Sequence, residues 1–587
     1  MIRRVVAPFL LVVSVIPAQQ ARRVDDNTLK SAGKAGEEWL TYGLTQSETR
    51  YSPLKQIDTT NVSRLTPGWT YDLGAGGGAQ EATPLVSNGT IYGITNWSVV
   101  FAVDARTGKE RWRWDPEVNQ TAVFPRICCG VVNRGIAIYQ GMILAPAIDG
   151  RLFALNAETG KPIWEARVAY PQDQQTITMA PRIAKGKVII GVSGGDRPTR
   201  GYFDAYDAMT GKKAWRFYTV PGDPSKGFES SAMRKAAETW DNEWWKLGGG
   251  GAVWDGMAYD PEADLIYAGT GNAEPWPGTL RSKDAQGKDN LYTASIVAVQ
   301  PETGELKWHY QMAPGDSWDY DSVQHLILAD LNIGGKQRKV IMQANKDGFY
   351  YVIDRVTGQF ISAQPFSTVN WAKGIDQKTG RPIVNPEAWY GKEAISISPG
   401  GGGAHNWSPM SFNPNTGLVY IPTSTTSSPF TYAAADTYPG TGTGTARPAP
   451  PNPLPSPPAI GPAPLSEGQG NRGALVAWDP VSQTMKWRMP GGGGIGGGTV
   501  TTAGNLVFQA INDGRLVAYS ADKGEKLLEI QTGLRGGMGP PVTYQLDGKQ
   551  YVAVMGGTGP VQPRNGQAAT PPVTPPVLPK LLTYSLP

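Results

Sequence analysis

Acidic and amide side chains recur at the ends of apolar, glycine-containing runs in this chain. One run ends in Asp196, a second ends in Asn272, and a third segment places Asp316, Asp319 and Asp321 among aromatic residues. Oxygen atoms of this kind are the ligands that a hard cation such as calcium requires. The simpler interpretation is that Asp and Asn at strand ends cap turns, as they commonly do. The pattern alone leaves both interpretations open.

Cys128 and Cys129 are adjacent, and they are the only cysteines in the 587 residues. Disulfides usually join Cα atoms about 4.4–6.8 Å apart, whereas chain neighbours lie about 3.8 Å apart. A bond between the two would therefore close a small ring with a rigid local surface. The alternative is a pair of reduced, buried thiols. The choice depends on the compartment, because disulfides persist in oxidising environments.

Residues 1–21 have the features of a signal peptide. Two arginines precede the apolar stretch Val5–Ile16, and Ala18 or Ala21 offers a small residue for cleavage. The stretch is too short for a membrane span, and no later segment approaches the roughly 20 apolar residues that a span needs. We therefore expect a mature chain from about residue 22 in an oxidising compartment, which favours the disulfide.

The composition excludes some functions and favours one fold class. The 54 basic and 50 acidic residues give a net charge of +4 without a long basic run, so we expect no nucleic-acid partner. The chain contains 73 glycines, 19 tryptophans and 24 tyrosines, and it has no long stretch of helical periodicity. These features predict an all-β protein.

A short outline repeats along the chain. The segments 101–112 and 153–164 share the pattern Phe-Ala-x-Asp/Asn-Ala-x-Thr-Gly-Lys and both end in Trp. Each alternates apolar and polar residues around a glycine turn, which predicts a β-hairpin. The recurring Trp is large enough to fill the wedge between neighbouring sheets, so we interpret it as a core residue. Related segments occur at 204–215, 297–308, 351–359, 476–487 and 517–528.

The period of the repeat predicts a β-propeller. Successive Thr-Gly steps at 107, 159, 210 and 303 are 52, 51 and 93 residues apart. We therefore place a degenerate copy at Met257–Ala268, in the longest gap. Together with Trp69, the copies give seven or eight blades, and we predict eight.

The remaining segments are expected to complete a single propeller formed by residues 22–587. The C-terminal residues 581–587 are predicted to pair with the first blade, because closed rings protect sheet edges. The Pro-rich stretches 435–466 and 561–579 are predicted to be loops.

The docking tryptophans, the Cys128-Cys129 pair and the acidic segments together resemble the alcohol dehydrogenases that depend on pyrroloquinoline quinone (PQQ), such as bacterial methanol and ethanol dehydrogenases. The resemblance runs from about Trp39 to the C-terminus. It implies a periplasmic enzyme that oxidises a primary or secondary alcohol to an aldehyde or ketone by hydride transfer to metal-bound PQQ.

The resemblance also implies a set of cofactor contacts. Trp254 would cover one face of the quinone, and a disulfide between Cys128 and Cys129 would cover the other. Lys346 corresponds to the cation beside the reactive quinone oxygens. For a lone arginine such as Arg134, an ordinary surface charge is the alternative. The other matching positions are Glu81, Arg134, Thr178, Ser193, Gly194, Gly195, Asn406 and Trp407.

The resemblance assigns the metal to Asp196, Asn272 and Asp319, with two departures from the family's pattern. The family usually has Glu at the position of Asp196, which is one methylene shorter. Asp321, two residues after Asp319, corresponds to an added Asp in the lanthanide-using branch. Calcium and a lanthanide therefore stay equal alternatives.

The reaction implied by the resemblance has two catalytic side chains. Asp319 would take the hydroxyl proton of the alcohol, and Lys346 would stabilise the developing negative charge while the metal polarises the quinone. The chain has no Cys-x-x-Cys-His haem motif, so we expect a separate soluble c-type cytochrome as electron acceptor. A homodimer is considered beside a monomer.

Two further interpretations stay open at the level of sequence. One is the same chemistry on a sugar, a polyol or a bulky hydroxylated compound. The other is a non-catalytic propeller that serves as a scaffold of the cell envelope.

Overall fold

The structure is a computed structural model, and it describes residues 23–282, 288–391, 393–431, 454–463, 473–491, 496–534, 536–559 and 577–587. The predicted signal peptide and most of the two Pro-rich stretches lie outside these residues. None of the helices in the described ranges is both long and apolar enough to cross a membrane.

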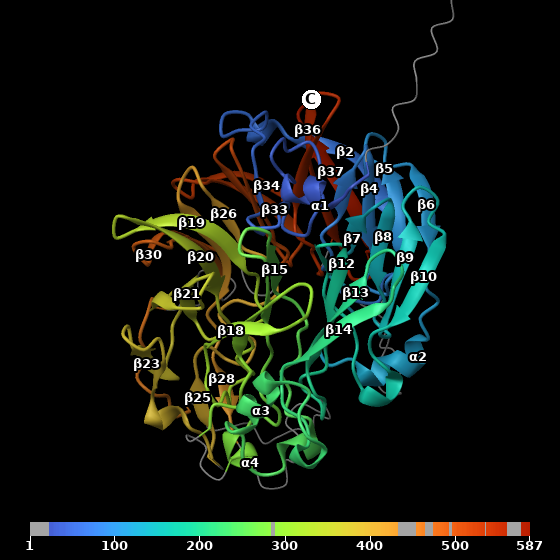
Figure 1. Ribbon diagram of the computed structural model, residues 1–587. Helices are drawn as coiled ribbons and strands as arrows, with labels where there is room; N and C mark the ends of the chain where they lie inside the picture. Colours follow the sequence, from blue (N-terminus) through green and yellow to red (C-terminus); the bar gives the residue numbers. More distant parts are fainter. Residues whose placement is uncertain are drawn as a thin grey trace, which may run out of the picture.

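In the described residues, eight antiparallel blades of four strands each, one of them extended by a fifth strand, follow one another around a ring, which confirms the predicted eight-bladed propeller (Figure 1). The first four blades consist of β3 (Leu85–Ser87), β4 (Thr90–Ile94), β5 (Val100–Asp104) and β6 (Glu110–Trp114); β7 (Ala137–Tyr139), β8 (Met142–Pro146), β9 (Arg151–Asn156) and β10 (Pro162–Arg167); β11 (Arg182–Ala184), β12 (Lys187–Gly191), β13 (Tyr202–Asp207) and β14 (Lys213–Tyr218); β15 (Met257–Asp260), β16 (Leu265–Gly269), β17 (Ser295–Val299) and β18 (Leu306–Gln311).

The other four blades continue the same order and close the ring. They consist of β19 (Ile327–Ile333), β20 (Lys336–Ala344), β21 (Phe349–Asp354) and β22 (Phe360–Pro365); β26 (Ser411–Asn413), β27 (Leu418–Ser424), β29 (Gly473–Asp479) and β30 (Thr484–Pro490); β31 (Gly498–Thr502), β32 (Leu506–Ala510), β33 (Arg515–Ser520) and β34 (Lys526–Gln531); β35 (Val542–Leu546), β36 (Lys549–Gly556), β37 (Lys580–Ser585) and β2 (Thr66–Asp72).

Several short strands and helices lie outside the four-stranded blades. The strand β1 (Tyr51–Ser52) pairs in parallel with β31, and β23 (Ala372–Ile375) with β24 (Pro382–Val384) and β25 (Ile395–Ile397) with β28 (Ser428–Phe430) form two small sheets. The helices are α1 (Asp26–Lys30), α2 (Gln120–Val123), α3 (Ser231–Ala237) and α4 (Gly278–Arg281), with 3₁₀ turns η1 (Val62–Arg64), η2 (Phe124–Arg126), η3 (Pro171–Asp173), η4 (Pro224–Lys226), η5 (Trp244–Leu247) and η6 (Pro386–Ala388).

The last blade joins the two ends of the propeller. Its strand β2 comes from the N-terminal part of the chain and pairs antiparallel with β37, so that Thr66 lies opposite Ser585 and Asp72 opposite Lys580. Figure 1 shows the blue β2 beside the red β36 and β37. The C-terminal segment therefore pairs with a strand from the N-terminal part of the chain, but this strand completes the eighth blade and does not belong to the first blade, as was predicted.

The predicted use of the repeated tryptophan at the joints between blades is confirmed. Trp112 lies against Gly160 of the next blade, where a Cβ atom would come within 2.6 Å of the indole, and its Nε1 donates to Ala157 O at 3.0 Å. Gly160 has φ +71°, a conformation that glycine adopts without steric cost. The same contact recurs between Trp69 and Gly108, Trp164 and Gly211, Trp215 and Gly304, Trp308 and Gly358, and Trp487 and Gly524.

The degenerate copy predicted at Met257–Ala268 is wrong. These residues form β15 and β16, the first hairpin of the same blade whose second hairpin is the copy at 297–308. The gap of 93 residues arises because long connections enter this blade and separate its two hairpins, and they carry α3, η5 and α4. A first hairpin with alternating apolar residues resembles a second hairpin in sequence, although it has no docking tryptophan.

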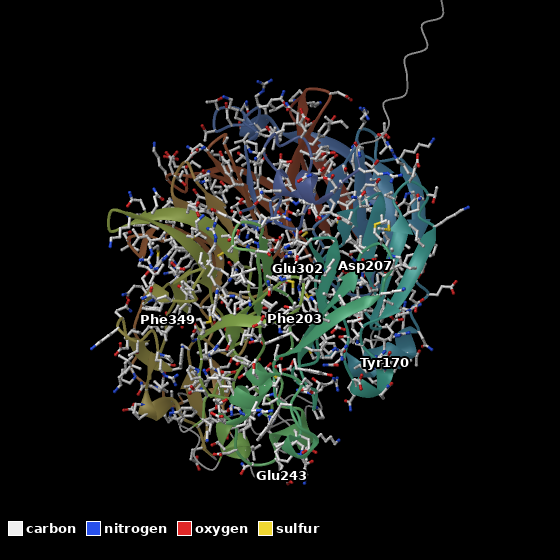
Figure 2. The ribbon with its side chains drawn as sticks, in the orientation of Figure 1. Tyr170, Phe203, Asp207, Glu243, Glu302 and Phe349 are labelled. Atoms are coloured by element: carbon white, nitrogen blue, oxygen red, sulfur yellow. A yellow bond between two sulfur atoms is a disulfide. The ribbon has the colours of Figure 1, made fainter. Side chains whose placement is uncertain are left out.

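Side chains fill the spaces between the blades (Figure 2). The labelled Phe203 and Phe349 are fully buried, whereas Tyr170 is 47% exposed at the outer surface. The first strands of consecutive blades contact one another, as β7 does with β11 and β11 with β15. The first strand of each blade therefore lies nearest the axis of the ring, and the segments that enter it are the ones that reach the hub.

Candidate active site

The site residues that were predicted from the sequence lie at one end of the hub, because of the directions of the strands that carry them. Glu81, Thr178 and Trp254 precede the first strands of their blades, whereas Asp196 and Lys346 follow second strands. Since the first and second strands of a blade are antiparallel, the start of one and the end of the other lie at the same end of the sheet. The residues that precede first strands also include Cys128, Cys129, Arg134, Asp319, Asp321, Asn406 and Trp407, and those that follow second strands include Ser193, Gly194, Gly195 and Asn272.

Backbone hydrogen bonds link the entry segments of neighbouring blades. Thr83 N donates to Arg134 O at 3.1 Å, and Arg134 N donates to Thr178 O at 2.9 Å. Ser193 N donates to Thr176 O at 2.8 Å. The polar side chains at this end of the hub are therefore carried by a continuous network and not by independent loops.

Lys346 lies between two carboxylates. Its Nζ is 2.8 Å from Asp319 Oδ2 and 2.7 Å from Asp321 Oδ2. Burial lowers the pKa of Lys346, but the two carboxylates raise it more, so that the net direction is upward and the amine is charged. Gly403 makes room for this side chain, because a Cβ atom there would lie 2.0 Å from Lys346 Cγ.

Asp321 organises the neighbouring groups. Its Oδ1 accepts a hydrogen bond from the Asn272 backbone N at 2.8 Å and one from Trp254 Nε1 at 3.2 Å, while its Oδ2 faces Lys346. The carboxylate is thereby held by donors from three other segments. It fixes the indole that we expect to face the cofactor.

Asp319 and Asp316 have different local roles. Asp319 has φ +65°, which is uncommon for a residue with a Cβ atom and is typical of functional sites. Asp316 accepts from the backbone N atoms of Trp318 and Tyr320 at 3.0 and 3.1 Å, so it caps the turn that presents Asp319. Of the three carboxylates in this segment, two face the hub and one holds the backbone.

Negative charge accumulates around Asp196 and Asp319. Burial, followed by the Asp321 carboxylate, raises the pKa of Asp196 to about 6. Burial also raises the pKa of Asp319 well above its usual value, with Lys346 acting in the opposite direction and Asp321 adding to the rise. A cation at this place would relieve both effects.

Arg134 forms the centre of the second half of the site. Its Nη2 is 2.8 Å from Glu81 Oε2 and its Nη1 donates to Thr178 Oγ1 at 3.0 Å. The guanidinium lies 5.0 Å from the centre of the Trp254 ring and 5.6 Å from that of Trp407. The alternative of an ordinary surface charge is wrong for Arg134, which is 5% exposed.

Two hydroxyl groups extend the half of the site around Arg134, and we call this half the cradle. Thr178 Oγ1 lies 2.6 Å from Ser193 Oγ and 3.1 Å from Trp254 O. The glycines after Ser193 permit close approach, since a Cβ atom at Gly195 would lie 2.9 Å from Asn272 Oδ1. The amide oxygen of Asn272 therefore lies beside the segment that ends in Asp196.

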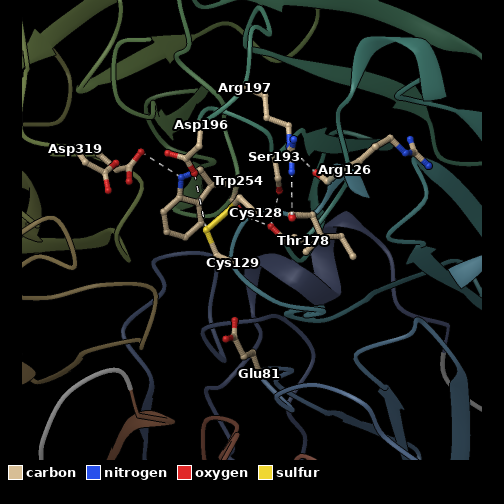
Figure 3. The surroundings of a disulfide bond; sticks show 12 residues. Glu81, Arg126, Cys128, Cys129, Thr178, Ser193, Asp196, Arg197, Trp254 and Asp319 are labelled. Carbon is tan, nitrogen blue, oxygen red and sulfur yellow. Dashed lines mark hydrogen bonds between the residues drawn. A yellow bond between two sulfur atoms is a disulfide. The ribbon is translucent and has the colours of Figure 1, made fainter. Parts of the chain in front are cut away.

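Cys128 and Cys129 are joined in a disulfide, as the predicted export of the chain favoured. Figure 3 shows the disulfide in the same region as Trp254, Thr178, Ser193 and Asp196. Cys129 Sγ is 3.8 Å from Asp196 Oδ2. Because both sulfurs are engaged in the disulfide, they do not act as thiolate ligands, and the donor atoms left for a cation here are oxygens.

Asn406 and Trp407 differ in how closely they join the site. Trp407 is buried and faces Arg134, as described above. Asn406 uses its amide locally, since its Nδ2 donates to Gly402 O at 2.8 Å and its Oδ1 accepts from Trp407 N at 2.8 Å. The structure brings Trp407 to the cradle, and Asn406 has a role in the turn before it.

Two acidic residues of the site were not predicted from the sequence. Asp255 follows Trp254 directly, is 3% exposed, and has its Oδ2 3.6 Å from Arg134 Nε. Glu274 follows Asn272 by two residues and is fully buried. Their positions next to Trp254 and Asn272 were the only signals available in the sequence.

The residues present fit a hard cation and a planar anionic cofactor. On one side, the carboxylates of Asp319 and Asp321 lie beside a single lysine, and the amide oxygen of Asn272 lies beside Gly195, next to Asp196. On the other side, the Arg134 guanidinium and two hydroxyl groups offer donors near a flat indole. The fold and the site together define a propeller whose hub could bind a hard cation beside a planar, anionic molecule.

Comparison with known proteins gives the family. The chain matches the family described as glucose/ethanol/alcohol dehydrogenase, beta-propeller domain, over residues 39–373 and 469–552. It is 49% identical over 552 residues to the quinohemoprotein alcohol dehydrogenase ADH IIB of Pseudomonas putida, covering 94% of this chain and 77% of that protein. It is 44% identical over 533 residues to the 1-butanol dehydrogenase (cytochrome c) of Thauera butanivorans, covering 89% of this chain and 75% of that protein.

Solved structures agree with these relatives. The quinohemoprotein alcohol dehydrogenase of Comamonas testosteroni superposes with a TM-score of 0.85 at 43% identity, covering 96% of this chain and 82% of that one. A europium-containing methanol dehydrogenase superposes with a TM-score of 0.82 at 34% identity, covering 96% and 100%. The chain belongs to the PQQ-dependent alcohol dehydrogenase family. It is an enzyme that oxidises alcohols with PQQ and a metal ion, and the alternative of a non-catalytic scaffold is set aside.

Proposed function

We propose that this chain is a periplasmic alcohol dehydrogenase in which Asp319 is the general base, and that its electrons pass to a separate c-type cytochrome. The position of Asp319 carries the proposal. Its carboxylate lies at the hub beside the charged Lys346, on a backbone held in a left-handed conformation by the surrounding structure.

The cofactor is assigned to the space between the disulfide and Trp254. Arg134, Thr178 and Ser193 would hold carboxylate groups of PQQ, because their donors converge next to the indole. Asp196, Asn272, Asp319 and Asp321 would hold the metal ion, which is calcium or a lanthanide. When bound, PQQ supplies the acceptor for the two electrons that leave the alcohol.

The residues of the chain then have separate tasks. A carboxylate at Asp319 can accept the hydroxyl proton of an alcohol that lies within about 2.6–3.2 Å of it. The ammonium group of Lys346 donates to negative charge that develops beside it, and it acts against the rise that burial causes in the pKa of Asp319. The side chains of Lys346 and Asp319 are 4% and 14% exposed, and this low exposure strengthens the interactions between them.

Two observations support the compartment and the acceptor. The Cys128–Cys129 disulfide is stable outside the cytoplasm, and residues 1–21 have the composition of a signal peptide. The relative from Thauera butanivorans is named for cytochrome c, which supports a c-type cytochrome as the acceptor.

Replacement of the base tests the proposal. Purified Asp319→Asn loaded with PQQ and calcium or lanthanum is expected to retain the absorption spectrum of bound PQQ and to lose turnover of primary alcohols by about 10²–10⁴-fold. Turnover is measured with an artificial dye and with a c-type cytochrome. Asp330→Asn, at a carboxylate that is 58% exposed, is the control and should retain turnover. Unchanged turnover in Asp319→Asn would remove Asp319 from this role.

A further inference from the structure

Glu274 is a buried carboxylate that the fold leaves without a partner. The residue is fully buried, and no described residue forms a hydrogen bond with Oε1 or Oε2. Buried carboxylates are normally paired, hydrogen-bonded or bound to a metal, because removal of the charge from water is costly. The position of Glu274 in the wall of the acidic cluster therefore requires an explanation.

The backbone turns Glu274 toward the cluster. Ala273 pairs with Gly250 in an isolated antiparallel bridge, and the adjoining bonds run from Gly251 N to Asn272 O at 2.8 Å and from Glu274 N to Gly249 O at 3.0 Å. In an extended segment, residues two apart point to the same face. Glu274 therefore shares the face of Asn272, whose Oδ1 lies beside Gly195 and so next to Asp196.

Electrostatics place the same two carboxylates together. After burial, which is the larger cause, the charge of Asp196 is the next cause that raises the pKa of Glu274. Trp276 follows on the same segment, and its interaction with the Asp196 side chain acts to lower the pKa of Asp196. The segment 274–276 therefore lies beside Asp196.

Arg281 does not neutralise Glu274 through a hydrogen bond. Arg281 influences the pKa of Glu274, but none of its hydrogen bonds goes to the glutamate. Its Nε donates to Asn290 Oδ1 at 3.1 Å, and its terminal nitrogens donate to the backbone carbonyls of Pro275, Trp276, Gly315 and Asp316.

The carboxylates of the acidic cluster outnumber the cations that pair with them. Asp196, Glu274, Asp319 and Asp321 carry four negative charges when ionised, and Lys346 supplies one positive charge to the last two. Three negative charges then lack a counter-ion, and two of them belong to Asp196 and Glu274. A trivalent ion balances this sum, whereas a divalent ion leaves one charge over.

We propose that Glu274 is a ligand of the metal ion, beside Asp196 and Asn272, and that it shifts the preference of the site toward trivalent lanthanides. This inference rests on the proposed function, which assigns the ion to Asp196 and Asn272. Glu274 and Asn272 then form a pair of ligands two residues apart, as Asp319 and Asp321 do on the other side.

Binding measurements with a neutral isostere test the proposal. PQQ-loaded wild-type protein and Glu274→Gln are titrated calorimetrically with lanthanum chloride and with calcium chloride. We expect the affinity for lanthanum to fall by about tenfold or more in Glu274→Gln, with a smaller loss for calcium. Glu48→Gln is the matched control, because Glu48 is also buried but has Arg182 as partner at 2.6 Å, and it should bind both ions as the wild type does.

A structure of the wild-type protein provides a second measurement that needs no variant. In crystals loaded with PQQ and lanthanum, located by anomalous scattering, a carboxylate oxygen of Glu274 is expected at about 2.3–2.6 Å from the ion. An ion more than about 4 Å from both oxygens, or equal lanthanum affinity in folded Glu274→Gln, would overturn the inference. If the wild type bound neither ion with PQQ, the proposed function would fall as well, whereas normal binding and turnover with an uninvolved Glu274 would reject the inference alone.

Discussion

Glu81 should make the stability of the cofactor-free protein depend on pH in a defined window. Burial is the largest cause that raises its pKa from 4.5 to about 7, the charge of Arg134 acts in the opposite direction, and Asp255 adds to the rise. In the unfolded chain the pKa returns to about 4.5. Between these two values the folded state binds more protons than the unfolded state, so the free energy of unfolding falls as the pH rises.

The magnitude follows from the two pKa values. The stabilising contribution of protonated Glu81 is fully present below pH 4.5 and is lost as the pH rises through about 7. One pKa unit corresponds to about 1.4 kcal/mol, so the loss between pH 5 and pH 8 is about 2.5 kcal/mol. With an entropy of unfolding of about 2.1 cal/mol/K per residue, this change shifts the melting temperature of a 587-residue chain by about 2 °C.

Glu81→Gln isolates this contribution. The variant keeps the shape of the side chain and cannot ionise, so the difference in unfolding free energy between wild type and variant should change by about 2.5 kcal/mol between pH 5 and pH 8. Urea denaturation and calorimetry of protein free of PQQ and metal give the values. Glu165→Gln, at an exposed glutamate of β10, should follow the wild type at every pH. Parallel pH profiles of wild type and Glu81→Gln would refute the assigned ionisation.

The remaining predictions concern the cradle and the joints between blades. Arg134→Met should weaken PQQ binding by about 10–100-fold, because a hydrogen bond from a charged donor, with a net contribution of about 1.5–3 kcal/mol, is lost. Fluorescence titration with PQQ measures the affinity. The control Arg106→Met, at an exposed arginine, should bind PQQ as the wild type does. Trp112→Ala should lower the free energy of unfolding by about 3–5 kcal/mol, because a buried indole and its hydrogen bond to Ala157 are removed. A loss under 1 kcal/mol in chemical denaturation would contradict the docking role of this tryptophan.

Much of the fold could be predicted from the sequence because the repeat carries its own geometry. Each repeat has a glycine at its turn and a tryptophan in the strand after it. The tryptophan of one blade contacts the glycine of the following blade, as Trp112 contacts Gly160. The error at Met257–Ala268 has the same origin. Alternating apolar residues specify a hairpin, but they do not say whether it is the first or the second hairpin of a blade.

The site could be predicted only where a residue type is unusual at its place. Adjacent cysteines and paired aspartates such as Asp319 and Asp321 are visible in a sequence, and the structure brings them to one end of the hub. Asp255 and Glu274 have no such mark, because burial and the lack of a partner are properties of the folded state. Asp316 shows the opposite case, since the same residue type in the same segment serves as a turn cap.

The balance of charge at the hub connects these observations. Arg134 lies between Glu81 and Asp255 on the cofactor side, and Lys346 lies between Asp319 and Asp321 on the metal side, so each cation faces two carboxylates. When these carboxylates are ionised, both halves are anionic before any ligand binds, although PQQ itself brings further carboxylates. Binding of PQQ must then depend on the metal ion, because the ion reverses the sign of the nearest charge. Removal of the ion with a chelator should weaken PQQ binding more than removal of any single neutral contact would.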